Sequence, residues 1–203
     1  MDHTVWDRIE AARDRWNVLE HPFYQRWSAG ELSAEELADY SGQYRHAVEA
    51  IAEVSAYIAR ELPDQPDLVG HAREESEHVA LWDGFVEAVA GRADAEPTPE
   101  TSDCVEAWTR TDGTVAALAR LYAIESGQPE ISRTKLEGLA AHYGVGDGRG
   151  TEYFTVHRGR DVEHAAEGRA LLESVLDESN ADLAVEAAED AFRANWRLLD
   201  GVS

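Results

Sequence analysis

Two histidines and an aspartate lie close together in the stretch 153–173, at spacings that suit metal binding. His157, Asp161 and His164 are separated by four and then three residues. On an α-helix with about 3.6 residues per turn, residues at these spacings share one face over two turns. Metal sites in helical bundles combine such inward-facing imidazoles and carboxylates with ligands from other helices. The stretch therefore predicts a metal site that needs a second set of ligands elsewhere in the chain.

Candidates for the second set lie on two further segments. Glu75 and His78 form a Glu-x-x-His pair, and Glu125 follows a largely apolar run. Two neighbours could take the place of Glu75, because Glu74 precedes His78 by one helical turn and His71 precedes it by two. We prefer Glu75 and keep Glu74 and His71 open, with His71 either a ligand or a residue that supports one.

The charges of these groups indicate how many ions they would hold. Three buried carboxylates in one pocket would repel each other and take up protons unless cations balanced them. Two divalent ions supply four positive charges, and imidazoles complete the coordination. Oxygen ligands mixed with imidazole suit iron or manganese, while the lack of thiolates argues against zinc. We therefore expect an Fe/Fe or Mn/Fe centre. The predicted metal-binding residues are His71, Glu75, His78, Glu125, His157, Asp161 and His164.

Hydrophobic periodicity predicts helices to carry these groups. The helical segments cover residues 6–20, 33–61, 67–90, 105–126, 130–143, 153–173 and 181–200, with a short segment at 21–27. Gly127 to Pro129 should kink or end a helix, and residues 91–103 should form the longest linker. No strand alternation is visible. With 203 residues and 43% hydrophobic content, we expect residues 1–203 to form one all-α domain, a bundle of about seven helices.

Composition limits the surroundings and partners of the protein. The single cysteine, Cys104, is expected in a polar linker and excludes an intramolecular disulfide framework. A net charge of −23 argues against nucleic acid and anionic membranes as partners. Seventeen of the eighteen basic residues are arginine, and the acids are spread along the chain, which favours a source adapted to high salt. Without a membrane span or signal-peptide pattern, we expect a cytoplasmic protein, and we expect a homodimer.

The motifs together resemble those of a known family. Glu75/His78-Val-Ala-Leu-Trp-x-x-Phe, Leu-Tyr-Ala-Ile-Glu125-Ser-x-Gln-Pro and Tyr-Phe-x-x-His157-x-x-x-Asp161-x-x-His164 resemble the haem-oxygenase-like di-metal oxidases. The family is related in fold to the TenA proteins, and the resemblance covers nearly the whole chain. It implies a haem-oxygenase-like bundle that activates O2 at two metal ions and needs an external reductant. Family members often place a glutamate two turns before the first histidine, and this chain departs from that pattern with His71.

Two further stretches are similar to one branch of the family, the CADD-like proteins. They are His21-Pro-Phe-Tyr24-x-x-Trp and Glu125-Ser-Gly-Gln-Pro-Glu-Ile-Ser-Arg-Thr-Lys135-x-x-Gly-Leu. That branch is implicated in making para-aminobenzoate for folate, and is understood to consume one of its own tyrosines while a lysine gives the amino nitrogen. The resemblance implies these two roles for Tyr24 and Lys135.

The chemistry of lysine strengthens this interpretation, because Lys135 is the only lysine in the chain. Arginine keeps its charge at ordinary pH, since its pKa exceeds about 12, and cannot act as an amine nucleophile. A lysine that is deprotonated in an apolar pocket can. Tyr153, one turn before His157, is a further candidate catalytic residue that could relay electrons or protons.

We therefore hypothesise a self-sacrificing para-aminobenzoate synthase that uses Tyr24 and Lys135. The main alternative is a di-iron oxidase with multiple turnovers on an external amino acid, fatty acid or amine, which would need a matching cavity and would not depend on Lys135. A third alternative is a helical module that binds partner proteins, which would not need the metal ligands.

Overall fold

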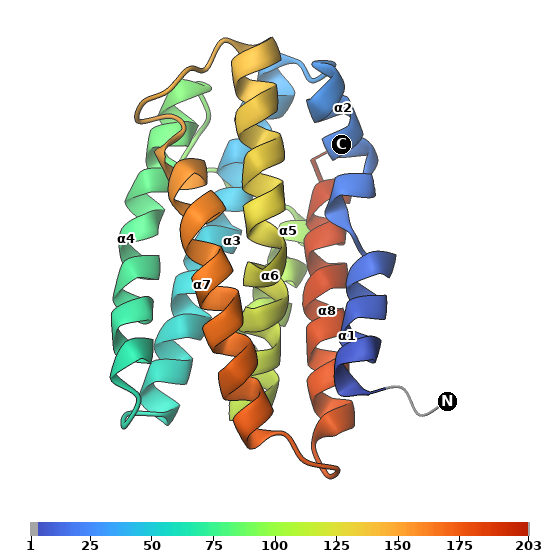
Figure 1. The fold of residues 1–203 in the computed structure, drawn as a ribbon. Helices are drawn as coiled ribbons and strands as arrows, with labels where there is room; N and C mark the ends of the chain where they lie inside the picture. Colours follow the sequence, from blue (N-terminus) through green and yellow to red (C-terminus); the bar gives the residue numbers. More distant parts are fainter. Residues whose placement is uncertain (1–3, 203) are drawn as a thin grey trace.

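The computed structural model describes residues 4–202, and within that range the chain forms eight α-helices and no β-strand (Figure 1). The helices are α1 (Val5–Arg15), α2 (Pro22–Ala29), α3 (Ala34–Glu61), α4 (Pro66–Ala88), α5 (Pro99–Thr109), α6 (Thr114–Gly138), α7 (Glu152–Val175) and α8 (Ala181–Asp200). A 3-10 turn, η1 (Val18–Glu20), precedes α2, and a π-helical turn, η2 (Leu139–Tyr143), follows α6. The predicted all-α class is confirmed.

Local signals in the sequence explain several helix starts. Ser33 begins α3 with a capping box, in which its hydroxyl accepts from the backbone N–H of Glu36 and the Glu36 carboxylate accepts from the N–H of Ser33. Pro22 is the first residue of α2, where its missing N–H costs nothing, and the ring of His21 caps that helix. These ends fix where the long helices enter the bundle.

Helix α6 is longer than predicted. A kink or a helix end was predicted at Gly127 to Pro129. The predicted helix end is wrong, because α6 runs through Pro129 to Gly138. Proline in a helix interior removes one hydrogen bond and costs about 3 kcal/mol. The helix continues because the turns after the proline bury Ile131 and Lys135 against the rest of the bundle. Tertiary packing has overridden the local signal.

The region around Cys104 also differs from prediction. A polar linker was expected there, but Thr98 caps α5 and Pro99 begins it. Cys104 lies on this helix with 0% exposure, inside the core. Helix α5 ends at Thr109, and Gly113, with a φ of 116°, precedes the start of α6. The single helix predicted over residues 105–126 is therefore two helices.

The bundle places the three helices with predicted ligands next to one another. Helix α6 packs against both α7 and α8, and α4 packs against α7 and α3 (Figure 1). Ligands on α4, α6 and α7 can therefore meet between these helices. None of the helices in residues 4–202 has the length and apolar character of a membrane span.

Candidate metal centre

Side chains from α4, α6 and α7 converge into two groups that share one residue. The four-residue group consists of His71, Glu75, Glu125 and His164. The three-residue group consists of Glu75, His78 and His157. Within each group the candidate ligand atoms all lie within 4.8 Å of one another. Two adjacent positions for cations, joined by one carboxylate, are the arrangement that a dinuclear centre requires.

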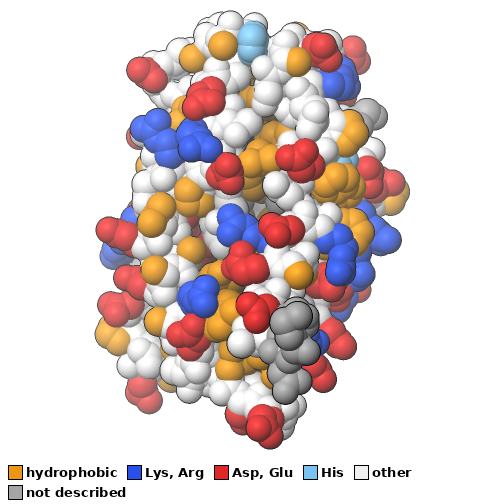
Figure 2. Space-filling model, turned by 45° about the vertical axis from the view of Figure 1, so that its right-hand side comes forward, with side chains coloured by type: hydrophobic (Ala, Val, Ile, Leu, Met, Phe, Trp, Pro, Cys, Tyr) orange, Lys and Arg blue, Asp and Glu red, His pale blue; other side chains and the backbone are white. Residues whose placement is uncertain are grey.

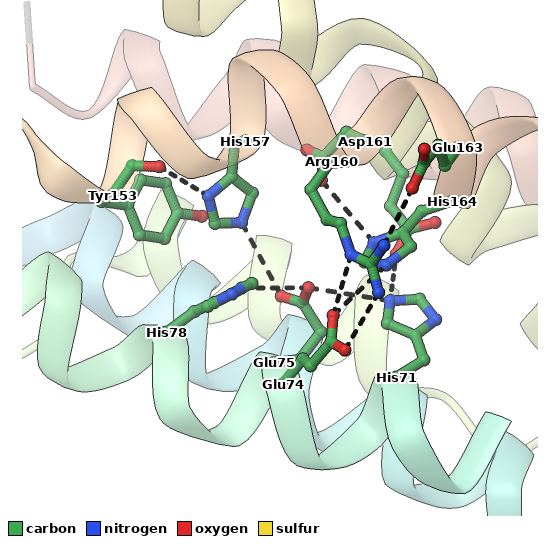
Figure 3. A network of polar contacts seen from close by, with 11 residues as sticks. His71, Glu74, Glu75, His78, Tyr153, His157, Arg160, Asp161, Glu163 and His164 are labelled. Atoms are coloured by element: carbon green, nitrogen blue, oxygen red, sulfur yellow. Dashed lines mark hydrogen bonds and ion pairs between the residues drawn. The ribbon is translucent and has the colours of Figure 1, made fainter. Parts of the chain in front are cut away.

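Glu75 lies at the junction of the two groups (Figure 3). Its Oε1 is 3.1 Å from Nδ1 of His78 and 3.6 Å from Nε2 of His71. Its Oε2 is 3.9 Å from Nε2 of His157. Oε1 thus lies between the two groups, while Oε2 lies near His157 of the three-residue group. Glu74 instead forms a two-fold ion pair with the exposed Arg160, at 3.0 and 3.1 Å.

Asp161 lies beside these groups and is 1% exposed. Its Oδ1 is 3.8 Å from Nδ1 of His164, and neither of its carboxylate oxygens has a hydrogen-bond partner. Burial, together with the charges of Glu125 and Glu75, raises the pKa of Asp161 to about 9. Without a cation nearby, this carboxyl group holds a proton at neutral pH.

The other candidate ligands have shifted pKa values, and these shifts indicate which buried groups hold protons. Burial alone lowers the pKa of His71, but contacts with Glu125 and Glu75 raise it to about 10. Burial and the neighbouring His71 lower the pKa of His164 to about 4. Burial raises the pKa of Glu125, and three imidazoles hold that of Glu75 well below its ordinary range despite its burial. Divalent cations could replace the protons on Asp161 and His71.

One ligand has its ring orientation fixed by the backbone. Nδ1 of His157 lies 2.8 Å from the carbonyl oxygen of Tyr153, so this nitrogen donates its proton there. In the tautomer that donates from Nδ1, the lone pair of the neutral ring is on Nε2, which has no hydrogen-bond partner. The ring of Tyr153 stacks on His157 with centroids 3.9 Å apart. The imidazole is thereby held with a free lone pair directed at the three-residue group.

These observations fit a pair of first-row metal ions. Buried polar atoms normally have partners, yet both oxygens of Asp161, Nε2 of His157 and Nδ1 of His164 have none. The donors are imidazole nitrogens and carboxylate oxygens, a set that suits iron and manganese. Six of the seven predicted metal-binding residues belong to the two groups, and Asp161 lies beside them, next to His164.

Two of the other predicted site residues, Lys135 and Tyr24, lie together in a second cluster among aromatic rings. Lys135 is 1% exposed, and its Nζ lies 5.8 Å from the ring centroid of Tyr24, 5.2 Å from that of Tyr40 and 4.6 Å from that of Tyr44. Burial lowers the pKa of Lys135 well below its ordinary value, with no acidic group acting against it. The hydroxyl groups of Tyr24 and Tyr40 lie 3.3 Å apart. The structure therefore brings Lys135 and Tyr24 together in an aromatic pocket.

Trp82 links the two clusters, and in the sequence it stands only as part of a motif, with no predicted role. Its ring centroid lies 5.1 Å from that of Tyr44 and 4.9 Å from that of Tyr153. Its Nε1 donates to the carbonyl oxygen of Ser41 at 2.8 Å, which fixes the indole. Its position near the site could have been predicted from spacing, because Trp82 follows His78 by four residues and so shares its helical face.

Comparison with protein-family models gives one match to the iron-containing redox enzymes, over residues 62–196. Curated relatives extend over almost the whole chain. The 4-aminobenzoate synthase of Chlamydia trachomatis is 31% identical over 208 residues, which cover 96% of this chain and 90% of that protein. The 4-aminobenzoate synthase of Nitrosomonas europaea is 30% identical over 224 residues, covering 98% of this chain and 91% of that protein.

Solved structures give the same fold. A TenA homologue from P. horikoshii matches with a TM-score of 0.80 and 17% identity, over 98% of both chains. A CADD-like protein of unknown function from Nostoc punctiforme matches with a TM-score of 0.72 and 17% identity, over 98% of this chain and 95% of that one. The expected haem-oxygenase-like fold is thus confirmed, and so is the resemblance to the TenA and CADD-like proteins.

Proposed function

Because this chain belongs to the family of iron-containing redox enzymes with the haem-oxygenase-like fold, we propose that it makes 4-aminobenzoate at a two-metal centre. We further propose that the atoms of the product come from the protein itself. Tyr24 supplies the ring, and Lys135 supplies the amino nitrogen. The names of the relatives support the product, since about 30% identity extends over nearly the full length of both chains.

The observation that carries this proposal is the position of Lys135. It is the only lysine in the chain, it is 1% exposed, and its amine lies over the ring of Tyr24. Burying the long side chain of a lysine without an acidic partner costs free energy. The same burial favours the neutral amine, which is the form that can transfer nitrogen. A buried position that costs stability and provides a reactive group is typical of a functional residue.

The metal ligands would hold two ions of iron, or one of iron and one of manganese. When bound, such a pair would supply the oxidising power for the reaction from dioxygen and an external reductant. The protein excludes water from the reacting groups, since Tyr24 and Tyr153 are 2% and 1% exposed. The hydroxyl of Tyr40, 3.3 Å from that of Tyr24, orients the phenol.

The cavity that reaches the metal ligands is small for an external substrate. It has a volume of about 160 Å³ and contacts His71, Glu125 and His164. Pockets for small-molecule ligands usually measure about 300–1,000 Å³. This comparison favours a substrate from within the protein over an external amino acid, fatty acid or amine.

Mass spectrometry of the protein after reaction tests the proposal. The protein is incubated with iron, manganese, a reductant and air, and then digested. We expect the peptide with Tyr24 to lose its tyrosine side chain and Lys135 to change mass, with at most one product per chain. An anaerobic sample serves as the control. Sustained product formation by a polypeptide of unchanged mass would refute the proposal.

Substitution of Lys135 separates the proposal from its main alternative. Lys135→Arg keeps a basic side chain but removes the transferable amine. We expect product formation to be abolished while iron binding persists. A fully active Lys135→Arg protein would support an oxidase that acts on an external substrate.

A further inference from the structure

The cavity of about 160 Å³ lies between α4, α6 and α7 and ends at the four-residue group. Leu68, Leu118, Leu121 and Leu171 provide its apolar walls. His164 lines the cavity and is 4% exposed, and its Nδ1, which lies 3.8 Å from Asp161, has no hydrogen-bond partner. A water molecule occupies about 30 Å³ in the liquid, so the cavity has room for roughly five waters or a partly hydrated ion.

Charged residues lie both at the cavity and across the α4–α7 contact beside the metal centre, but within residues 4–202 those at the cavity form no ion pair with an arginine. Asp67 and Glu167 line the cavity and are exposed, so they would attract cations to its mouth. Arg160 of α7 links α7 to α4 near the centre, where its guanidinium group is paired with Glu74 and with Glu163 (Figure 3). Oε2 of Glu74 is 3.6 Å from Nε2 of His164. A cation approaching through these residues would have to break the ion pairs of Arg160 with Glu74 and Glu163.

Only one of the two groups borders the cavity. His71, Glu125 and His164 line it, whereas His78 and His157 do not. Glu75 belongs to both groups and lies between them. An ion that enters through the cavity therefore reaches the four-residue group first and can pass to the three-residue group by way of Glu75.

We propose that this cavity is the entry route for partly hydrated divalent metal ions, and that the four-residue group receives each ion before the three-residue group. The inference rests on the two-metal centre of the proposed function. It adds a path and an order of loading, and it assigns to Asp67 and Glu167 the attraction of ions to the mouth, which is separate from ligation.

Gly168 offers a way to plug the route without touching a ligand. It lines the cavity, and a Cβ atom added there meets no atom within 4 Å. Gly159 on the same helix is an exposed glycine that is equally open, and it provides a matched control. Gly168→Phe should fill the cavity, whereas Gly159→Phe should leave it open.

The experiment mixes metal-free protein with Mn²⁺ under anaerobic conditions and follows loss of the EPR signal of free Mn²⁺ over time. We expect Gly168→Phe to load roughly tenfold more slowly than the wild type, because a filled interior leaves no path for an ion. Gly159→Phe should load at the wild-type rate, and all three proteins should bind the same final amount. Equal rates for Gly168→Phe and the wild type would overturn the route, as would equal slowing by both substitutions. A wild type that binds no Mn²⁺ would refute the metal centre itself.

A second pair of variants tests whether the acidic residues at the mouth attract ions, without filling the cavity. The double variant Asp67→Asn/Glu167→Gln should load about tenfold more slowly at low salt, and the difference should shrink as salt screens the charges. Glu152→Gln removes an exposed charge from α7, the helix that carries Glu167, and should leave the loading rate unchanged. A double variant that loads as fast as the wild type at low salt would also overturn the proposal.

Discussion

The residues that carry chemistry in this protein are buried polar groups within an apolar bundle. Six of the seven residues predicted to bind metal come together in the two groups, because helical spacing places them on shared helix faces, and their role as ligands stays a prediction. Helical spacing favoured Glu75 but left Glu74 and His71 open, since all three lie within two turns of His78; His71 and Glu75 both lie in the four-residue group. Only packing separates them: Glu75 is 2% exposed and contacts three imidazoles, whereas Glu74 pairs with Arg160 at the surface.

The aromatic pocket around Lys135 could be predicted only in part. The resemblance to a known branch pointed to Lys135 and Tyr24, but the rings of Tyr44 and Trp82 come from segments distant in sequence. No spacing rule connects residues on three different helices. Their proximity depends on how α3, α4 and α6 pack.

Burial of Lys135 should make folding stability depend on pH. Its pKa in the folded protein lies well below the ordinary value of 10.5. Between these two values the unfolded chain binds a proton that the folded chain does not, so stability falls as pH decreases from about 10.5 towards the lowered pKa. Each pKa unit corresponds to about 1.4 kcal/mol.

We therefore expect Lys135→Met to raise the free energy of unfolding at pH 7 by about 1 kcal/mol or more. The gain should shrink as pH approaches 10.5, where the lysine is neutral in both states. Urea denaturation of the wild type and of Lys135→Met at pH 7 and pH 10 measures this gain in the free energy of unfolding. A destabilised Lys135→Met protein at pH 7, or a gain that does not depend on pH, would contradict the assigned neutral amine.

At the scale of elements, the ligands depend on close packing between α4 and the turn before α7. A Cβ atom at Gly84 of α4 would lie 2.6 Å from the carbonyl oxygen of Arg149, and one at Gly150 would lie 2.6 Å from Cβ of Ala88. These glycines let the helix and the turn approach each other, which sets the distance between Glu75 on α4 and His157 on α7.

We expect Gly84→Ala to lower the free energy of unfolding by about 1–3 kcal/mol, because the clash is with backbone that cannot move freely. It should also weaken metal binding by separating α4 from α7. Gly70→Ala on the same helix is the control: nothing lies within 4 Å of its Cβ, so it should stabilise the protein by about 0.5–1 kcal/mol. Thermal unfolding measures the stability of the two variants, and iron titration measures their metal binding. Similar stability and similar metal binding of both variants would count against the proposed contact.

Element boundaries show where local sequence signals are weaker than packing. The capping box at Ser33 and the proline at position 22 gave correct helix starts. Pro129 suggested an end that the structure does not have, since the following turns are held by burial of their apolar face. The polar run before Cys104 suggested a loop, although Thr98 and Pro99 are also a helix start signal. Burial of Cys104 was not visible in composition alone.

At the scale of the whole molecule, the net charge of −23 is spread over the surface. Acidic side chains are scattered across the face drawn in Figure 2, with basic side chains between them. Their repulsion opposes the compact state, and it weakens as the screening length falls from about 10 Å at 0.1 M salt to about 3 Å at 1 M.

We therefore predict that the free energy of unfolding rises as NaCl increases from about 0.1 M to about 1 M, where screening is nearly complete. Urea denaturation at each salt concentration measures the change, and an uncharged osmolyte at matched osmolality controls for effects unrelated to charge. Unchanged or decreasing stability with added NaCl would argue against adaptation to high salt.

The central claim is that Glu75 joins two cation positions built from α4, α6 and α7. Anaerobic titration of the metal-free protein with Fe²⁺, followed by metal analysis after removal of unbound iron, tests it most directly. We predict binding of about two ions per chain, and substantial loss at both positions in Glu75→Ala, because both groups contain this residue. Binding of one ion or none per wild-type chain, or unchanged binding in Glu75→Ala, would contradict the account.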